Sequence, residues 1–291
     1  MGSQRKVTTL ADLKKWESEL VGEYYRLIVQ DKLDGISLQL NYKGGKLIQA
    51  ITRGDGTEGE DIFENALKME GVPTTIDFDK DLEVRCEVLL YKKNMQHFDD
   101  AKTARNMAAG VAKRHNGEGV SWLNVKAYDI RNWKDLGFKK VTSSLKLLED
   151  LGFDVVNYKV VRTIEEVQEV YEEYIKTIRE NLEWVIDGLV IKAGIFGDDD
   201  WAAPRRSIAY KFPPKFGYTT LLDVVWQDTG GRISPVAILD PATIDGVTIG
   251  RATLNNVDHI KKLGVKIGDT VKVSRRNDVI PCIEGVHLAD P

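Results

Sequence analysis

The residues of this 291-residue chain that could do chemistry begin with a lysine two positions before an Asp-Gly pair, in Lys32-Leu33-Asp34-Gly35. Polar and apolar residues then alternate from Ile36 to Tyr42, which is typical of a strand. A lysine amine can act as a nucleophile once it is neutral. The pattern alone also fits a solvated lysine beside a turn, so its meaning depends on what else the chain carries.

Five further motifs follow Lys32 in a fixed order. They are Thr52-Arg53-Gly54-Asp55-Gly56, Val84-Arg85-Cys86-Glu87-Val88, Ala104-Arg105-Asn106-Met107-Ala108-Ala109-Gly110, Ile186-Asp187-Gly188-Leu189-Val190-Ile191-Lys192 and Ile208-Ala209-Tyr210-Lys211-Phe212-Pro213. With Lys32, the series resembles the nucleotidyltransferase core of DNA ligases, and its first and third motifs resemble the NAD-dependent bacterial branch. Residues 234–237, 251–256 and 267–281 are similar to the OB-fold domain of that family. The resemblance covers the chain from about Leu10 onward.

The resemblance implies an α+β fold with two domains. A nucleotidyltransferase (adenylation) domain with antiparallel sheets is expected over residues 1–215, and a small OB-fold β-barrel over 216–291. Periodicity predicts helices at 9–20, 59–67, 93–111, 143–151 and 164–182, and strands at 24–29, 36–42, 47–51, 82–91 and 184–193. Lys32 would then lie between two strands at a sheet edge. After the proline-containing linker at 212–217, short β-rich runs fit a five-stranded barrel.

Composition excludes several classes of protein. Hydrophobic residues make up 42% and charged residues 30%, as in an ordinary globular protein. The apolar runs fall far short of the ~20 residues that span a bilayer, and the N-terminus lacks an apolar signal region, so a cytoplasmic protein is expected, in a host cytoplasm if it is viral. The net charge of −4 argues against a strongly basic nucleic-acid binder. Two cysteines, Cys86 and Cys282, are too few for a cysteine-rich zinc site.

The chemistry that the resemblance implies is the sealing of 3′-hydroxyl/5′-phosphate nicks in duplex DNA. AMP is first taken onto a lysine as a phosphoramidate, then passed to the 5′-phosphate, and finally displaced by the 3′-hydroxyl. Lys32 is the expected nucleophile. Lys192 and Lys211 are expected in the same pocket, where their charge would stabilise the transferring α-phosphate.

Several other residues are implied to bind the nucleotide or the metal. The expected nucleotide contacts, besides the three lysines, are Gln30, Asp34, Gly35, Arg53, Glu87, Tyr128 and Asp187. Glu87 and Asp187 are also the expected Mg²⁺ ligands, because this hard cation prefers oxygen. Tyr128 is expected to stack on adenine, although a core tyrosine would look the same. Gln30 and Asp31 stand where the family has Glu-Leu, and the Gln30 carbonyl oxygen can still accept from the adenine amino group.

Contacts to DNA phosphates are expected from basic residues of both domains. These are Arg105, Lys113, Arg232, Arg251, Arg275 and Arg276. Two of them depart from the family pattern. Lys113 stands for an arginine, and Arg232 is displaced because Asp228-Thr229-Gly230-Gly231 replaces a Gly-Arg-Thr-Gly stretch.

The resemblance implies NAD⁺ as the AMP donor, with ATP as the alternative. Only 31 residues precede Lys32 in this sequence, fewer than the helical domain that grips the nicotinamide half in the family would need, and the zinc, helix-hairpin-helix and BRCT modules are not expected within these 291 residues. Three explanations remain. The chain is an NAD-dependent ligase completed by a second subunit in trans, a compact ATP-dependent ligase that also joins RNA-containing ends, or a non-catalytic nick-binding module. The third is disfavoured, because pure binding does not need Lys32, Glu87, Asp187, Lys192 and Lys211 together.

Overall fold

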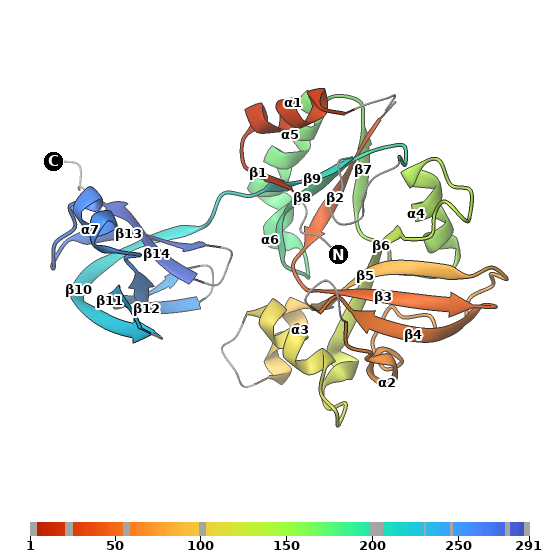
Figure 1. Ribbon diagram of the computed structural model, residues 1–291, viewed down its shortest axis with the longest axis horizontal. Coiled ribbons are helices and arrows are strands. Elements are labelled where there is room, and N and C mark those ends of the chain that lie inside the picture. Colours follow the sequence, from red (N-terminus) through yellow and green to blue (C-terminus); the bar gives the residue numbers. More distant parts are fainter. Residues whose placement is uncertain are drawn as a thin grey trace. The chain divides into compact units, whose positions relative to one another are not determined.

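The chain forms two compact units. The computed structural model describes residues 5–20, 26–54, 59–98, 103–197, 206–229, 231–244, 247–276 and 280–287. The units divide between Phe212 and Pro213 (Figure 1). Each unit has its own hydrophobic core, so each is described by itself.

A five-stranded sheet in the first unit carries the lysine motif. Its order is β1-β9-β8-β2-β7, and its pairs are antiparallel except for β1 with β9. Its strands are β1 (Lys6–Val7), β2 (Leu27–Leu33), β7 (Tyr158–Val161), β8 (Ile186–Ala193) and β9 (Ser207–Lys211). Strand β2 therefore has a neighbour on each side.

A four-stranded antiparallel sheet completes the first unit, in the order β4-β3-β5-β6. Its strands are β3 (Ile36–Lys43), β4 (Lys46–Thr52), β5 (Leu82–Leu90) and β6 (Leu123–Ile130). Gly44 and Gly45, with φ of 54° and 73°, form the tight turn between β3 and β4, because such two-residue hairpins need positive φ at both positions. Asp34 and Gly35 connect β2 of one sheet to β3 of the other.

Helices cover the two sheets. Helix α1 (Leu10–Ser18) begins at Thr9, whose side chain accepts from the Asp12 amide, and it packs with α5 (Ile164–Glu173) in the core of the first sheet. Helix α3 (Ala104–Ala112) packs on the second sheet. The other helical segments described in the first unit are α2 (Phe63–Ala66), η1 (Lys92–His97), η2 (Val120–Trp122), α4 (Val141–Asp150), the π-helical segment Tyr174–Ile178 and α6 (Arg179–Asn181).

The second unit is a closed five-stranded barrel in the order β10-β11-β12-β14-β13. Its strands are β10 (Phe216–Thr229), β11 (Arg232–Ile244), β12 (Val247–Thr253), β13 (Thr270–Arg276) and β14 (Ile280–Val286). Leu239, Val271 and Ile283 lie in its core. Helix α7 (Val257–Leu263) begins at Asn256, whose side chain caps it. A small closed barrel after an α+β unit confirms the predicted fold class.

The structure corrects three details of the sequence analysis. Lys32 lies inside β2 rather than between strands at a sheet edge, because β2 continues to Leu33 before the chain enters the second sheet. The helix predicted over 93–111 is two segments, η1 and α3. The helix predicted over 164–182 contains the π-helical segment Tyr174–Ile178.

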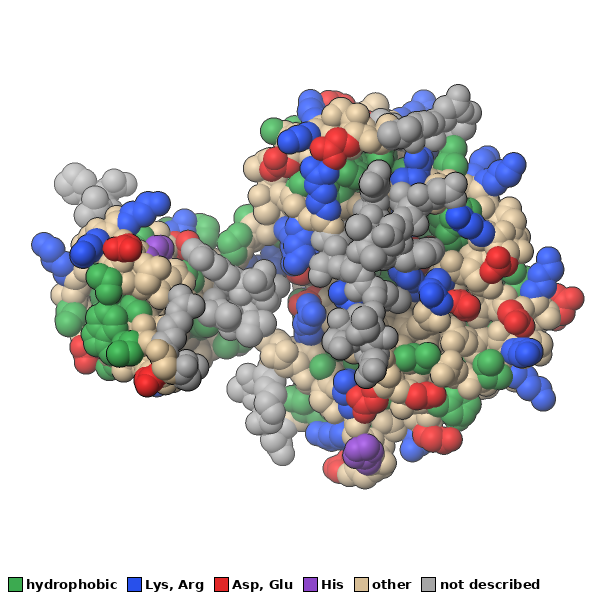
Figure 2. Space-filling model, viewed as in Figure 1, with side chains coloured by type: hydrophobic (Ala, Val, Ile, Leu, Met, Phe, Trp, Pro, Cys, Tyr) green, Lys and Arg blue, Asp and Glu red, His purple; other side chains and the backbone are tan. Residues whose placement is uncertain are grey.

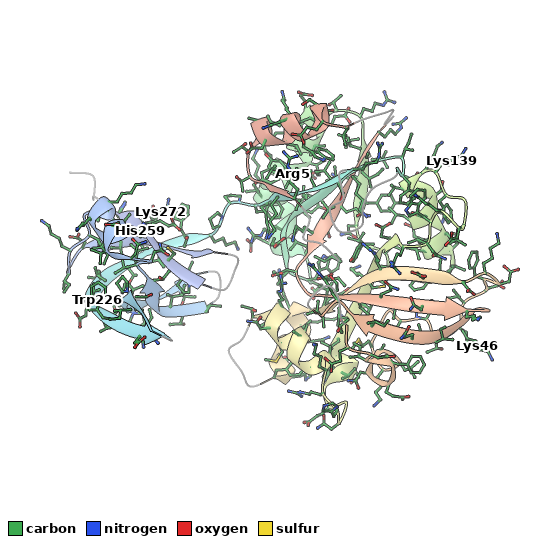
Figure 3. All side chains as sticks on the ribbon, in the orientation of Figure 1. Arg5, Lys46, Lys139, Trp226, His259 and Lys272 are labelled. Atoms are coloured by element: carbon green, nitrogen blue, oxygen red, sulfur yellow. The ribbon has the colours of Figure 1, made fainter. Side chains whose placement is uncertain are left out.

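The surface is mixed in character. Charged side chains of both signs are interspersed over the visible face of the first unit (Figure 2). On the barrel, Trp226 and Ile233 are exposed, and Figure 3 labels Trp226 on it. Lys272 places its Nζ 3.6 Å from the centre of the Phe216 ring. Within the described ranges, every helix is too short or too polar to cross a membrane.

Candidate active site

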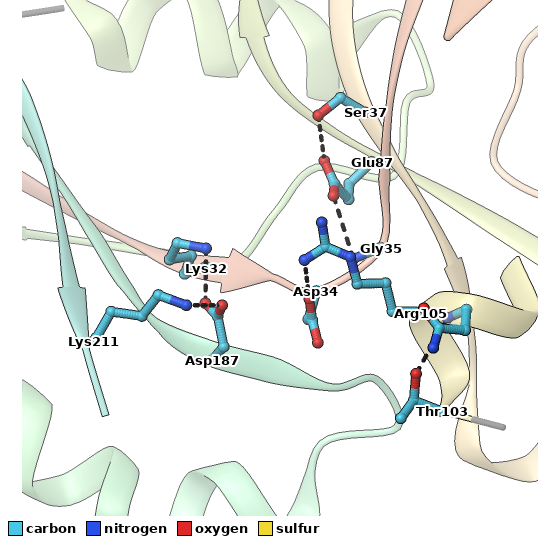
Figure 4. A network of polar contacts seen from close by, with 10 residues as sticks. Lys32, Asp34, Gly35, Ser37, Glu87, Thr103, Arg105, Asp187 and Lys211 are labelled. Carbon is cyan, nitrogen blue, oxygen red and sulfur yellow. Dashed lines mark hydrogen bonds and ion pairs between the residues drawn. The ribbon is translucent and has the colours of Figure 1, made fainter. Parts of the chain in front are cut away.

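Two lysines share one buried aspartate at the end of the first sheet. Lys32 Nζ lies 2.8 Å from Asp187 Oδ1, and Lys211 makes an ion pair with the other oxygen, Oδ2 (Figure 4). The lysines come from β2 and β9, and Asp187 comes from β8, which lies between them. Their side chains are 18%, 18% and 7% exposed. Three residues from distant parts of the chain thus meet at one point.

The two lysines decide the charge of Asp187. Burial alone raises the pKa of this carboxyl, but the nearby charge of Lys32 and the hydrogen bond from Lys211 outweigh burial, so the pKa lies below its ordinary value. Asp187 is therefore ionised at neutral pH and holds both ammonium groups in place.

Two glycines let the backbone approach closely enough to build this arrangement. A Cβ on Gly188 would lie 2.4 Å from the Tyr210 carbonyl oxygen and 2.9 Å from the Cα of Lys211, its partner in the ladder between β8 and β9. A Cβ on Gly35 would lie 2.0 Å from the Val88 carbonyl oxygen. Any other residue at either position would push the neighbouring strand away.

Glu87 stands on β5 beside the turn that follows Lys32. Its Oε1 accepts from the Gly35 amide at 3.3 Å and its Oε2 from the Ser37 hydroxyl at 3.2 Å (Figure 4). Burial raises the pKa of Glu87 to about 7, although the charge of Lys32 and these hydrogen bonds act in the opposite direction. Glu87 can therefore exchange a proton near neutral pH, or become a metal ligand when a cation offsets its burial.

Arg105 links α3 to the lysine motif. Its Nη1 donates to Asp34 Oδ1 at 2.8 Å, and Asp34 is buried while Arg105 is about half exposed. Thr103 caps the helix by accepting from the Asn106 amide. The guanidinium therefore holds the Asp34 turn while much of its surface remains open to solvent.

Gln30 and Lys192 converge on one backbone oxygen. Lys192 Nζ donates to the Tyr128 carbonyl oxygen at 3.1 Å and pairs with Asp129 Oδ2 at 3.3 Å. Gln30 Nε2 donates to the same carbonyl at 3.4 Å. A carbonyl can only accept, so this contact assigns the amide nitrogen of Gln30 and leaves its Oε1 available as an acceptor. The Tyr128 ring centre lies 5.7 Å from Lys192 Nζ.

The structure thus separates the expected lysines into two pairings. Lys32 and Lys211 share Asp187, whereas Lys192 pairs with Asp129. All three lie on strands of the same sheet. The three lysines therefore fall into two ion-pair groups, and the pocket expected to hold all three stays a prediction.

The remaining predicted residues lie around this site or on the barrel. Arg53 donates its backbone N–H to the Ser37 carbonyl at 3.1 Å. Lys113, after α3, pairs with Glu60 at 2.8 Å. Arg251 is exposed on β12. The side chains of Arg232, Arg275 and Arg276 lie outside the described part of the structure.

Sequence reasoning missed two partners of the site. Ser37 accompanies Glu87, and Asp129 accompanies Lys192. Ser37 follows Gly35 by two residues in an alternating strand, a spacing that could have placed it on the same face. Asp129 gave no such signal, because its contact depends on how the two sheets meet.

The acidic residues of the site offer few ligands for a metal ion. Among the described residues no three His, Cys, Asp or Glu side chains group closely enough to hold a metal ion. Both oxygens of Asp187 are engaged by lysines, so Glu87 is the better placed of the two predicted ligands. This donor set suits Mg²⁺ only as an ion held mainly by water and substrate phosphates, which is its usual mode of binding.

Both units match families of known proteins. Residues 1–215 match the NAD-dependent DNA ligase adenylation domain, and residues 218–290 match the NAD-dependent DNA ligase OB-fold domain. A DNA ligase of Sorangium cellulosum is 40% identical over 269 residues, which cover 89% of this chain and 39% of the relative. A DNA ligase of Treponema denticola is 36% identical over 310 residues, which cover 100% of this chain and 48% of the relative. The chain spans less than half the length of either relative.

A solved structure shares the fold at low sequence identity. It comes from a structure-function study of Lig E DNA ligases and has a TM-score of 0.57 with 12% identity. The match covers 99% of this chain and 100% of that chain. At this identity the likeness concerns the fold alone.

Proposed function

The chain belongs to the NAD-dependent DNA ligase family, and we propose that it seals nicks in duplex DNA by way of AMP bound to Lys32. The observation that carries the proposal is the group in which Lys32 and Lys211 share the buried Asp187. A nucleophile held next to a second cation is what transfer of a nucleotidyl group requires, because negative charge on the phosphate grows during the reaction.

In the first step, Lys32 Nζ attacks the α-phosphorus of NAD⁺. A nitrogen–phosphorus bond forms, the bond from phosphorus to the bridging oxygen breaks, and nicotinamide mononucleotide leaves. The amine must give up a proton before it attacks. Lys211 competes with Lys32 for Asp187, so it weakens the hold of this carboxylate on the ammonium form and remains as a cation beside the phosphate.

Adenine recognition is proposed for Gln30 and Tyr128. Gln30 Nε2 donates to the Tyr128 carbonyl, which leaves Gln30 Oε1 as an acceptor. An amide oxygen accepts from an exocyclic amine. The Tyr128 ring, turned toward Lys192, offers an aromatic face for stacking. A guanine in this place would present an oxygen to an acceptor, which disfavours it.

Glu87 and Asp34 are proposed to support the reacting groups. Glu87, with its pKa near 7, binds the ribose or contributes one oxygen to Mg²⁺, which supplies positive charge on the phosphates. Asp34 holds the turn through Arg105. Arg53 is proposed to reach the nucleotide.

Contacts to the nicked DNA are proposed for basic residues of both units. Arg105 is partly open to solvent, so the side that does not face Asp34 can bind a phosphate. Lys113 and Arg251 are exposed or partly exposed basic side chains that can do the same. For Arg232, Arg275 and Arg276 the proposal rests on family membership.

A nick-sealing assay tests this function. Purified protein with NAD⁺ and Mg²⁺ should convert a labelled, nicked duplex to a sealed strand. Lys32→Ala should abolish sealing, and Lys32→Arg should do so too, because guanidinium keeps its charge and is a poor nucleophile. Sealing by either variant would contradict the assignment of the nucleophile. A nicked duplex with RNA at the 3′ side tests whether the enzyme also joins RNA-containing ends, and binding without sealing would indicate a nick-binding module.

A further inference from the structure

A second aspartate, Asp31, is buried on the opposite face of β2 from the proposed nucleophile. Only 3% of its surface is exposed. Side chains alternate along a strand, so Asp31 shares its face with Val29 and Leu33, which lie in the core under α1 and α5. Lys32 points the other way, to Asp187. Asp31 can therefore influence the nucleotide only by fixing the backbone position of Lys32.

Both carboxylate oxygens of Asp31 accept a hydrogen bond. Tyr174 donates its hydroxyl to Oδ1 at 2.7 Å, and Trp184 donates Nε1 to Oδ2 at 3.1 Å. The backbone N–H of Asp31 donates to the Asn157 carbonyl at 3.2 Å. We call Asp31, Tyr174 and Trp184 the Asp31 clamp. Three separate segments are thus fastened to the residue directly before Lys32.

The clamp holds β2 where its pairing is irregular. Asp31 pairs with Leu189 and Leu33 with Ile186, so Lys32 of β2 stands opposite two residues of β8, and β8 carries a bulge there. A bulge of this kind changes the direction of a side chain and is common beside active sites. Tyr174 also begins the π-helical segment, another irregularity that is frequent at functional sites.

An apolar residue would fill the Asp31 position at a lower cost to folding. Burial raises the pKa of Asp31, while the hydrogen bonds from Tyr174 and Trp184 and the charge of Lys126 act against it. A buried charge that is merely tolerated is usually replaced without loss by a hydrophobic residue. The directional hydrogen bonds of a carboxylate, in contrast, rigidify the segment that carries it when both oxygens have partners.

We propose that Asp31 is a positioning residue whose clamp fixes β2 opposite the bulge of β8 and so aims Lys32 at the nucleotide. The inference rests on the proposed function of Lys32. It assigns no contact between the clamp and the substrate. Its expected signature is a slower adenylation step at saturating nucleotide with unchanged nucleotide affinity.

Substituting Asp31 by asparagine or by leucine separates the effect of the clamp's hydrogen bonds from the effect of the carboxylate charge. In Asp31→Asn, the amide oxygen can accept from Trp184 and the amide nitrogen can donate to the Tyr174 hydroxyl, which accepts as readily as it donates. The clamp should survive without the charge. Asp31→Leu removes both acceptors, and Tyr174→Phe removes one donor. We expect Asp31→Leu to slow Lys32 adenylation about tenfold to a hundredfold, Tyr174→Phe less, and Asp31→Asn not more than about threefold.

Tyr42→Phe is the matched control. Tyr42 is equally buried in the other core of the unit, and its hydroxyl donates to the Pro73 carbonyl at 2.7 Å. It should lose comparable thermal stability to Tyr174→Phe without slowing adenylation. Binding of AMP to the unadenylated proteins measures affinity. The proposal would be overturned if Asp31→Asn slowed adenylation as much as Asp31→Leu. It would also be overturned if Tyr174→Phe and Tyr42→Phe were adenylated at equal rates.

Hydrogen exchange gives a readout that is independent of activity. Exchange of the peptide over residues 27–33 should accelerate in Asp31→Leu and Tyr174→Phe, and stay at the wild-type rate in Asp31→Asn and Tyr42→Phe. Unchanged exchange in Asp31→Leu would overturn the proposal. If wild-type protein is not adenylated at all, the proposed function fails, and accelerated exchange in Asp31→Leu would still support the clamp.

Discussion

Gly188→Ala should displace Lys211 from its position in the site without removing any charged side chain. The new Cβ would lie 2.4 Å from the Tyr210 carbonyl oxygen and 2.9 Å from the Lys211 Cα, whereas such contacts are essentially never below 3.0 Å. Both clashing atoms belong to the backbone of β9. This strand must therefore move by at least about 0.6 Å at the Tyr210 carbonyl, directly before Lys211, since a packed interior cannot absorb the change elsewhere.

The size of the effect follows from that displacement. Overpacking of this kind costs about 1–3 kcal/mol of folding stability. Misplacing a group near the reacting atoms by about 1 Å can cost about a hundredfold in rate, so we expect Gly188→Ala to slow formation of the lysyl-AMP adduct by about tenfold to a hundredfold. The variant should nevertheless remain folded at 25 °C, because the barrel and both sheets are otherwise unchanged.

Single-turnover adenylation, followed by intact mass, measures the rate, and urea unfolding measures the stability. Gly250→Ala is the control, because a Cβ at Gly250 meets nothing within 4 Å. It should adenylate at the wild-type rate. A folded Gly188→Ala protein that adenylates as fast as Gly250→Ala would refute the reasoning that the close approach of β8 and β9 positions Lys211.

Three further variants test separate parts of the site. Glu87→Gln should remove a pH dependence of stability. The pKa of Glu87 is about 7 in the folded protein against 4.5 for an exposed glutamate, so between these values the folded protein holds a proton that the unfolded chain has released. The wild-type free energy of unfolding should therefore fall from about pH 5 to 7.5 by up to about 3 kcal/mol. Urea titrations at pH 5 and pH 8 measure this change. The same loss of unfolding free energy between the two pH values in Glu87→Gln and in wild type would be the contrary result. Gln30→Ala should raise the KM for the adenine nucleotide about threefold to tenfold with little change in kcat, because one neutral hydrogen bond contributes about 1 kcal/mol; steady-state sealing assays would expose a kcat effect instead. Lys211→Met should slow adenylation about a hundredfold by removing the second cation on Asp187, and a single-turnover rate near that of wild type would exclude Lys211 from the chemistry.

The elements and the motif residues could be predicted from the sequence to a large extent. Alternation located β3 and β5. The two compact units divide between Phe212 and Pro213, within the proline-containing stretch 212–217. These features are local, because the period of two and the turn residues that interrupt it are written in consecutive positions. The order of the motifs also brought Lys32, Asp187 and Lys211 forward as one group.

The pairings within the site could not be predicted. Lys192 and Lys211 stand in similar apolar frames. The meeting of the two sheets gives Asp129 to Lys192, whereas the pairing of β8 with β9 gives Asp187 to Lys211. Asp31 appeared in the sequence only as a departure from a family pattern. Its hydrogen-bond donors, Tyr174 and Trp184, lie 143 and 153 residues away. The irregularities that aim Lys32 also depend on tertiary structure, since neither the bulge in β8 opposite Lys32 nor the π-helical segment interrupts its local sequence pattern.

Intact mass of the AMP-stripped protein, incubated with Mg²⁺ and either NAD⁺ or ATP, tests the central claim most directly. We predict a gain of one AMP with NAD⁺, mapped by peptide mass to Lys32 and absent from Lys32→Ala. A gain with ATP alone would contradict the proposed donor and keep the nucleophile. No gain with either donor, or a gain that persists in Lys32→Ala, would contradict the proposal that Lys32 carries AMP.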